Sequence, residues 1–181
     1  MVSSYTPTLD MLGNAQSFDT KIREPRVAII VQSEVDGQPT LTHASKEGDR
    51  IRETVPAQYV LKTTNTSLSA SGSEKTRIHE ALDHLREASI VHAACHGIQD
   101  PNNPLDSALL LEDGLLTISK IQSVQRAPGG SLAFLSACMS AKGDDTRPDE
   151  VIHLAATMLC VGFQSVVATM WYVAKQILRN R

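Results

Sequence analysis

Short apolar runs alternate along this chain with longer stretches that have helical spacing. The apolar runs predict buried strands at residues 26–32, 58–61, 89–95, 131–137 and 166–171. The longer stretches predict helices at residues 45–54, 74–87, 117–125 and 148–161. Strands that alternate with helices are typical of a parallel sheet with helices on both faces, so the pattern predicts an α/β fold.

The clearest of these elements is the helix over residues 74–87. Its apolar side chains fall at i, i+3, i+4 and i+7, which places Ile78, Ala81, Leu82 and Leu85 on one face. Ser45 and Thr117 are expected to cap the helices that they begin, and Gly162 to end the last one. An additional β-ribbon is predicted from Ser107, with its turn at residues 112–114.

Two of the predicted strands run directly into reactive side chains. The strand at 89–95 continues into His96-Gly97, and the strand at 131–137 continues into Cys138. Open parallel sheets place their functional sites at the carboxyl ends of the strands. If these two strands are neighbours, His96 and Cys138 meet there and form the base–nucleophile pair of a cysteine hydrolase.

The remaining cysteines and histidines have simpler interpretations. Free cysteine is among the most buried residue types, so Cys95 and Cys160 are expected in the core. His92 is expected to be a packed core residue or a partner of the site. The other histidines are expected at the surface or at helix caps: His43, His79, His84 and His153. A zinc site is disfavoured, because Cys95 and His96 would point to opposite faces of one strand.

Composition restricts the class of protein but does not indicate a particular activity. The 181 residues suit one domain, and 41% apolar with 20% charged residues is ordinary for a soluble globular chain. A formal net charge of −3 argues against non-specific nucleic-acid binding. An odd number of cysteines without C-x-x-C spacing favours a reducing compartment, so a cytoplasmic location is expected.

Targeting and membrane signals are weak. The first residues have neither a basic nor an apolar segment of the kind found in a secretory signal. The apolar stretch at 154–171 is divided by residues 162–165, so a membrane-spanning helix is not expected.

Several ordered motifs resemble the CHAT domain, the caspase-like peptidase domain that is related to the separases and often lies beside tetratricopeptide repeats. The two strands with their reactive residues carry the strongest likeness, at 91–97 and 135–138. Similar segments lie at 3–9, at 103–111 with Asp113-Gly114, at 149–150 and at 167–171. The resemblance therefore covers nearly the whole chain.

The resemblance implies a caspase-like three-layer fold with a mostly parallel sheet between helices. Residues 1–25 then form a lead-in segment, and residues 26–181 form the peptidase core. Members of the family have further structure before the first segment and after the last one. The chain is accordingly expected to be truncated at both ends, with a C-terminally incomplete core.

Cysteine peptidase chemistry is the implied activity, with His96 as general base and acid and Cys138 as nucleophile. A partly exposed thiol beside an imidazole suits this role, since its pKa is easily lowered. The backbone N–H groups of Gly97 and Cys138 are candidates for the oxyanion hole, because glycine allows close approach of a substrate carbonyl. No cofactor and no metal are expected.

The expected partners are a protein or peptide substrate and regulatory repeat-containing proteins, without nucleic acid or membrane. The flanking loops carry no arginine before Arg147, and their acidic rim favours basic or neutral side chains at the cleaved position. That rim consists of Asp100, Asp106, Asp144 and Asp145. The alternative function is a catalytically silent caspase-like module that acts by protein interaction.

Overall fold

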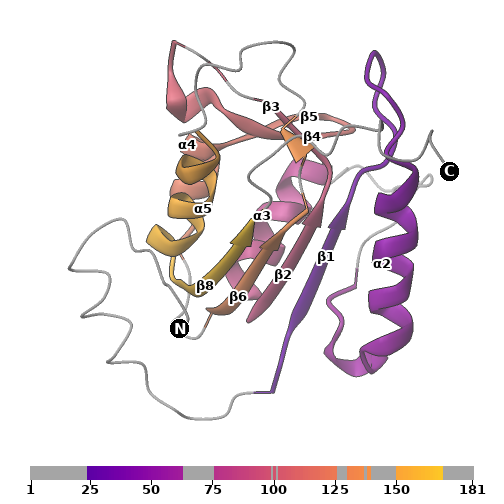
Figure 1. The fold of residues 1–181 in the computed structure, drawn as a ribbon. Helices are drawn as coiled ribbons and strands as arrows, with labels where there is room; N and C mark the ends of the chain where they lie inside the picture. Colours follow the sequence, from indigo (N-terminus) through magenta and orange to yellow (C-terminus); the bar gives the residue numbers. More distant parts are fainter. Residues whose placement is uncertain are drawn as a thin grey trace, which may run out of the picture.

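A parallel four-stranded sheet forms the centre of the molecule (Figure 1). The structure, a computed structural model, describes residues 24–62, 76–98, 100, 102–125, 130–136, 138–139 and 150–168. The strand order is β1-β2-β6-β8, and each neighbouring pair is parallel. These strands are β1 (Val27–Val31), β2 (Ile90–Ala94), β6 (Gly130–Leu135) and β8 (Phe163–Ala168). The predicted α/β fold with a parallel sheet is confirmed.

A second, smaller sheet continues from the carboxyl ends of two of these strands. Its order is β5-β4-β3-β7, in which β3 pairs antiparallel with β4 and parallel with β7. The strands are β3 (His96–Ile98), β4 (Ala108–Leu111), β5 (Gly114–Thr117) and β7 (Cys138–Met139). The antiparallel β4–β5 pair is the ribbon predicted from the sequence, with its turn at the expected residues.

Helices α2 (Thr42–Thr54) and α3 (Arg77–Glu87) pack against β1, and α5 (Glu150–Cys160) packs against β8. The short helix α4 (Ile118–Gln122) contacts α3 and α5. A Cβ on Gly48 of α2 would lie 2.7 Å from the Val31 side chain, so this helix approaches the sheet closely because it has glycine there. Ile30, the residue before Val31 in β1, belongs instead to the hydrophobic cluster that includes residues of α3. Alternate strand residues face opposite ways, so α2 and α3 cover opposite faces near β1.

The hydrophobic core lies between the sheet and the helices α3, α4 and α5. Leu85 of α3 and Val91 of β2 are fully buried in it, together with Met158 of α5. The β4–β5 hairpin adds Leu109 and Leu116 to the same cluster. One continuous core therefore joins the parallel sheet to the smaller sheet that carries His96. The more specific caspase-like three-layer arrangement stays a prediction.

Several predicted boundaries were wrong. The segment predicted as a strand at 58–61 begins as a 3₁₀ turn, η1 (Ala57–Tyr59), after Pro56, and only Val60 makes a parallel bridge to Val27. Helix α2 begins three residues before Ser45 and has no side-chain cap, because its first turn already forms at Thr42. The last strand begins at Phe163, three residues early, and its predicted end at 169–171 lies outside the described residues.

Helix α3 also begins later than the predicted 74–87, because Thr76 is its N-cap. The Thr76 hydroxyl accepts a hydrogen bond from the His79 N–H, which satisfies one of the donors that a helix start leaves unpaired. Thr117 caps α4 in the same way by accepting from Lys120 N–H, as predicted. Gly162 has a φ of +103°, which is the left-handed conformation expected of a glycine that ends a helix.

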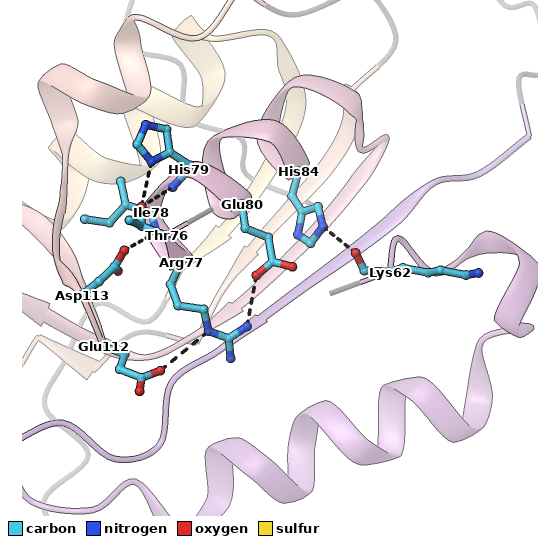
Figure 2. Close-up of polar contacts among 9 residues, drawn as sticks. All are labelled: Lys62, Thr76, Arg77, Ile78, His79, Glu80, His84, Glu112 and Asp113. Atoms are coloured by element: carbon cyan, nitrogen blue, oxygen red, sulfur yellow. Dashed lines mark hydrogen bonds and ion pairs between the residues drawn. The ribbon is translucent and has the colours of Figure 1, made fainter. Parts of the chain in front are cut away.

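The start of α3 is tied to the turn of the β4–β5 hairpin (Figure 2). The Ile78 N–H donates to Asp113 Oδ2 at 3.1 Å, so a carboxylate of the turn lies at the positive end of the helix. Arg77 donates to Glu80 at 3.1 Å, and its Nε lies 4.0 Å from Glu112. Because β4 pairs with β3, these contacts hold the hairpin beside the strand that carries His96.

Candidate active site

The two reactive positions lie directly opposite each other in the β3–β7 pair. His96 and Cys138 are register partners, and so are Gly97 and Met139. The offset between partners is 42 residues here and also in the β2–β6 pair, so the register is kept across the interruption of both strands. The prediction that the two segments are adjacent and parallel is confirmed.

The position of this pair corrects one part of the prediction. The parallel strands end at Ala94 and Leu135, and the reactive residues belong to the smaller sheet that follows. Cys95 separates β2 from β3, and Ser136 follows the end of β6. The pair therefore lies beyond the carboxyl edge of the parallel sheet, where α/β folds place their functional sites.

The imidazole of His96 is held by a backbone carbonyl. Its Nε2 lies 2.8 Å from Pro39 O, and the residue is only 2% exposed. A carbonyl oxygen can only accept, so Nε2 carries the proton and a neutral ring has its lone pair on Nδ1. Pro39 was missed in the sequence because it lies 57 residues away in an irregular loop, and no local pattern marks it.

Gly97 lies between β4 and β7, with Leu109 and Met139 as its register partners. It is buried, so its backbone is shielded from solvent in the middle of the smaller sheet. The oxyanion-hole function of the Gly97 and Cys138 N–H groups stays a prediction.

The acidic rim is described only in part. The Asp100 carboxylate accepts hydrogen bonds from the backbone N–H groups of Asn103 and Asn102, at 2.9 and 2.8 Å, and these lower its pKa. Asp106 accepts from the Asn103 side chain at 2.7 Å. Both carboxylates thus shape the loop after β3. Asp144 and Asp145 lie outside the described residues.

His92 is a packed core residue, as one of its two interpretations predicted. It is 5% exposed and stacks on Phe134, with the ring centroids 5.3 Å apart. Its Nε2 lies 3.6 Å from Glu47 Oε1, too long for a good hydrogen bond. Burial lowers the pKa of His92, and the nearby Glu47 carboxylate opposes this shift only in part.

The lowered pKa of His92 predicts a loss of stability in mild acid. The folded protein resists protonation of this ring, whereas the unfolded chain binds a proton below the ordinary value of 6.5. The contribution of His92 to the free energy of unfolding is therefore fully present above pH 6.5. It falls as the pH drops below this value, by at most about 1.4 kcal/mol per pH unit. Urea unfolding at pH 7.5 and 5.5 should show a smaller difference in His92→Phe than in wild type. An unchanged difference would contradict the prediction, and His43→Ala is the exposed control.

Two residues are more exposed or more buried than predicted. Cys95 is fully buried as expected, but Cys160 is exposed at the last position of α5, so its core assignment was wrong. His84 was expected at the surface and is instead buried, because its face of α3 turns inward. Its Nε2 contacts Lys62 O at 3.4 Å (Figure 2).

The two cysteines should differ strongly in reactivity with thiol reagents. Burial raises the pKa of Cys95 from 9.0 to about 12, which lowers its thiolate fraction about a thousandfold at neutral pH. In a Cys138→Ala background at pH 8, an aromatic disulfide reagent should modify Cys160 rapidly and Cys95 only after unfolding. Comparable rates for both thiols in the native protein would contradict the assignment. Urea supplies the internal control, since both should then react.

The described part of the chain offers no group of three or more histidine, cysteine or acidic side chains arranged to hold a metal ion. Within the same residues, no helix is both long and apolar enough to span a membrane. The expected absence of metals and cofactors remains a prediction.

An α/β fold that brings a histidine and a cysteine into register beyond a parallel sheet agrees with the resemblance noted in the sequence. The family model of the CHAT domain matches residues 3–180. The chain therefore belongs to the CHAT domain family, a group related to the caspase-like peptidases. A comparison with curated proteins found none that matches it.

Proposed function

We propose that this protein is a cysteine endopeptidase of the caspase–separase type, with Cys138 as nucleophile and His96 as general base and acid. The observation that carries the proposal is the register of β3 and β7, which places positions 96 and 138 opposite each other. The contact between His96 Nε2 and Pro39 O supports it, because a proton on Nε2 makes Nδ1 the basic nitrogen of the neutral ring. Membership of the CHAT family is consistent with this chemistry.

The proposed reaction uses His96, Cys138, two backbone N–H groups and a water molecule. His96 Nδ1 takes the proton of the Cys138 thiol, and the thiolate attacks the carbonyl carbon of the scissile peptide bond. The N–H groups of Gly97 and Cys138 stabilise the negative oxygen of the tetrahedral intermediate. The imidazolium then protonates the leaving amine as the C–N bond breaks, which leaves a thioester. Water, deprotonated by His96, hydrolyses the thioester and restores the thiol.

A covalent peptide probe tests this function and distinguishes it from a silent interaction module. A peptidyl acyloxymethyl ketone should label wild type, and labelling should be lost in Cys138→Ala and strongly reduced in His96→Ala. Cys160→Ala is the matched control, since it removes an exposed thiol away from the β3–β7 pair. Labelling that survives in Cys138→Ala, or wild type that does not react at all, would refute the proposal and favour the silent module.

As part of this proposal, a pocket beside β1 receives the side chain at the cleaved position, since the loop that lines this pocket also reaches His96 through Pro39. This polar pocket has a volume of about 800 Å³, within the usual range for ligand sites, and is lined by Val31 at the end of β1 and by residues 32–36 of the loop that also holds Pro39. Its arginines are already paired, Arg52 with Asp49 and Arg77 with Glu80. The acidic side chains of the lining outnumber them: Glu34, Asp36, Asp49 and Glu112.

A peptide library with one varied position measures the preference at the cleaved position. Lysine, arginine or neutral side chains should be cleaved at least about tenfold faster than aspartate or glutamate. Neutralising the pocket with Glu34→Gln and Asp36→Asn should reduce the advantage of basic side chains. A profile dominated by aspartate would contradict the expectation.

The substrate class and setting are part of the same proposal. We assign it protein or peptide substrates, a regulatory repeat-containing partner and a cytoplasmic location, with no nucleic acid and no membrane. The odd number of cysteines supports a reducing compartment.

A further inference from the structure

Glu47 is a charged residue on the side of α2 that packs against the sheet. It lies one turn after the buried Ala44 and beside the buried Gly48. Its side chain is 36% exposed, and its carboxylate reaches the end of β6 on the same sheet face. Glu47 Oε2 accepts a hydrogen bond from Ser136 Oγ at 3.0 Å, a contact between residues 89 positions apart.

Ser136 lies where the chain leaves β6 for β7, two residues before Cys138. Its backbone N–H donates to Ala93 O at 2.8 Å, so β2 holds its main chain. Glu47 of α2 holds its side chain through the second hydrogen bond. Ser136 is thus fixed twice, immediately before the short strand that places Cys138 opposite His96.

His92 lies beside the Glu47 carboxylate without forming a hydrogen bond to it. Its Nε2 lies 3.6 Å from Glu47 Oε1, and this buried nitrogen has no hydrogen-bond partner among the described residues. Because burial lowers its pKa, the ring is neutral at neutral pH and does not compete as a strong ion-pair partner. The shorter contact, to Ser136, is the one that satisfies the carboxylate.

The same stretch of chain also reaches His96. Pro39, eight residues before Glu47, accepts the hydrogen bond of the His96 imidazole. We propose that Glu47 is a positioning residue of the active site, which fixes Ser136 and thereby keeps Cys138 in register with His96. This inference rests on the proposed cysteine peptidase function and adds a residue that acts through Ser136 and not on the substrate.

Substitutions of Glu47 test this function against a merely structural one. We would measure kcat and KM for a peptide substrate and the rate at which iodoacetamide alkylates Cys138, followed by mass spectrometry. Glu47→Ala should lower kcat and the alkylation rate about tenfold or more, with KM nearly unchanged, since small displacements of reacting groups are costly. Glu47→Gln should stay within about threefold of wild type, because its amide oxygen still accepts from Ser136.

Two further variants serve as comparison. Glu53→Ala removes an exposed carboxylate from the same helix and should change neither rate. Ser136→Ala should reproduce the loss seen in Glu47→Ala, and the double variant should be no worse than either single one, because both remove the same hydrogen bond. Urea unfolding of every variant establishes that the rates are measured on folded protein. If Glu47→Ala does not fold, the rates of Ser136→Ala test the same hydrogen bond.

Each outcome separates this inference from the proposed function. Alkylation no slower in Glu47→Ala than in Glu53→Ala, or losses that multiply in the double variant, would overturn the positioning function. Wild type that cleaves no peptide would overturn the peptidase proposal instead. In that case the alkylation rate of Cys138 still tests the positioning function, provided that the rate depends on His96. A rate that falls in Glu47→Ala and recovers in Glu47→Gln would support that function by itself.

Discussion

Cys138→Ala is expected to abolish peptide cleavage, with a loss in kcat of roughly 10⁴- to 10⁶-fold. Alanine has no atom that can attack a carbonyl, so the thioester pathway is closed and only water remains as nucleophile. The backbone of β7 should be unaffected, because the substitution removes only the thiol and keeps the main chain that pairs with β3. The measurement is the rate of cleavage of a fluorogenic peptide at saturating concentration, with circular dichroism as the check on folding.

His96→Ala should cause a comparable loss, and the double variant should be little worse than either single one. Nucleophile and base act as one unit, so their effects are strongly non-additive. His43→Ala is the matched control, since this exposed histidine at the start of α2 should leave the rate unchanged. Cleavage that persists in either active-site variant would show that the register of positions 96 and 138 has another purpose.

The pairing of positions 96 and 138 could be predicted from the sequence because both strands carry a strong local signal. Buried parallel strands read as continuous apolar runs, and here each run ends next to a reactive side chain. The parallel pairing of these runs then followed from the general rule for strands separated by a helix. Thr117 and Gly162 were identified for a similar reason, since caps depend on one residue and its nearest neighbours.

The interruption of both strands could not be predicted in this way. Cys95 continues the apolar run of β2, and nothing in its side chain marks a change of sheet. The change depends on the β4–β5 hairpin, which pairs with His96–Ile98 and is held by α3 through Asp113. Such a tertiary contact decides where a strand ends, and local patterns do not contain it.

The burial of some helix residues was predicted wrongly for a related reason. His84 lies on the inner face of α3 beside Leu85, and the position of that face could have been read from the apolar spacing. Glu47 carried the same signal on α2, as an acidic residue next to the buried Ala44 and Gly48. Charged residues are seldom buried without a partner, so a carboxylate on an apolar face is itself an indication of a specific contact. That partner, Ser136, becomes visible only in the fold.

Leu85→Ala is expected to be the most destabilising of the single substitutions considered for the core. Leu85 is 0% exposed at the centre of the cluster that joins α3 to the parallel sheet and the β4–β5 hairpin. Removing its isopropyl group loses the transfer free energy and leaves a cavity, at a cost of about 2–5 kcal/mol. This is a large part of the roughly 5–15 kcal/mol that stabilises an ordinary domain.

Urea unfolding followed by circular dichroism measures the loss, with Leu105→Ala as the matched control. Leu105 is 45% exposed in the loop after β3, so the same change of side chain should cost no more than about 0.5 kcal/mol there. Because the shared core links α3 to the hairpin that pairs with β3, Leu85→Ala should also lower the urea concentration at which Cys138 loses its His96-dependent reactivity. Equal midpoints for the two leucine variants would mean that this cluster does not hold the active-site strands together.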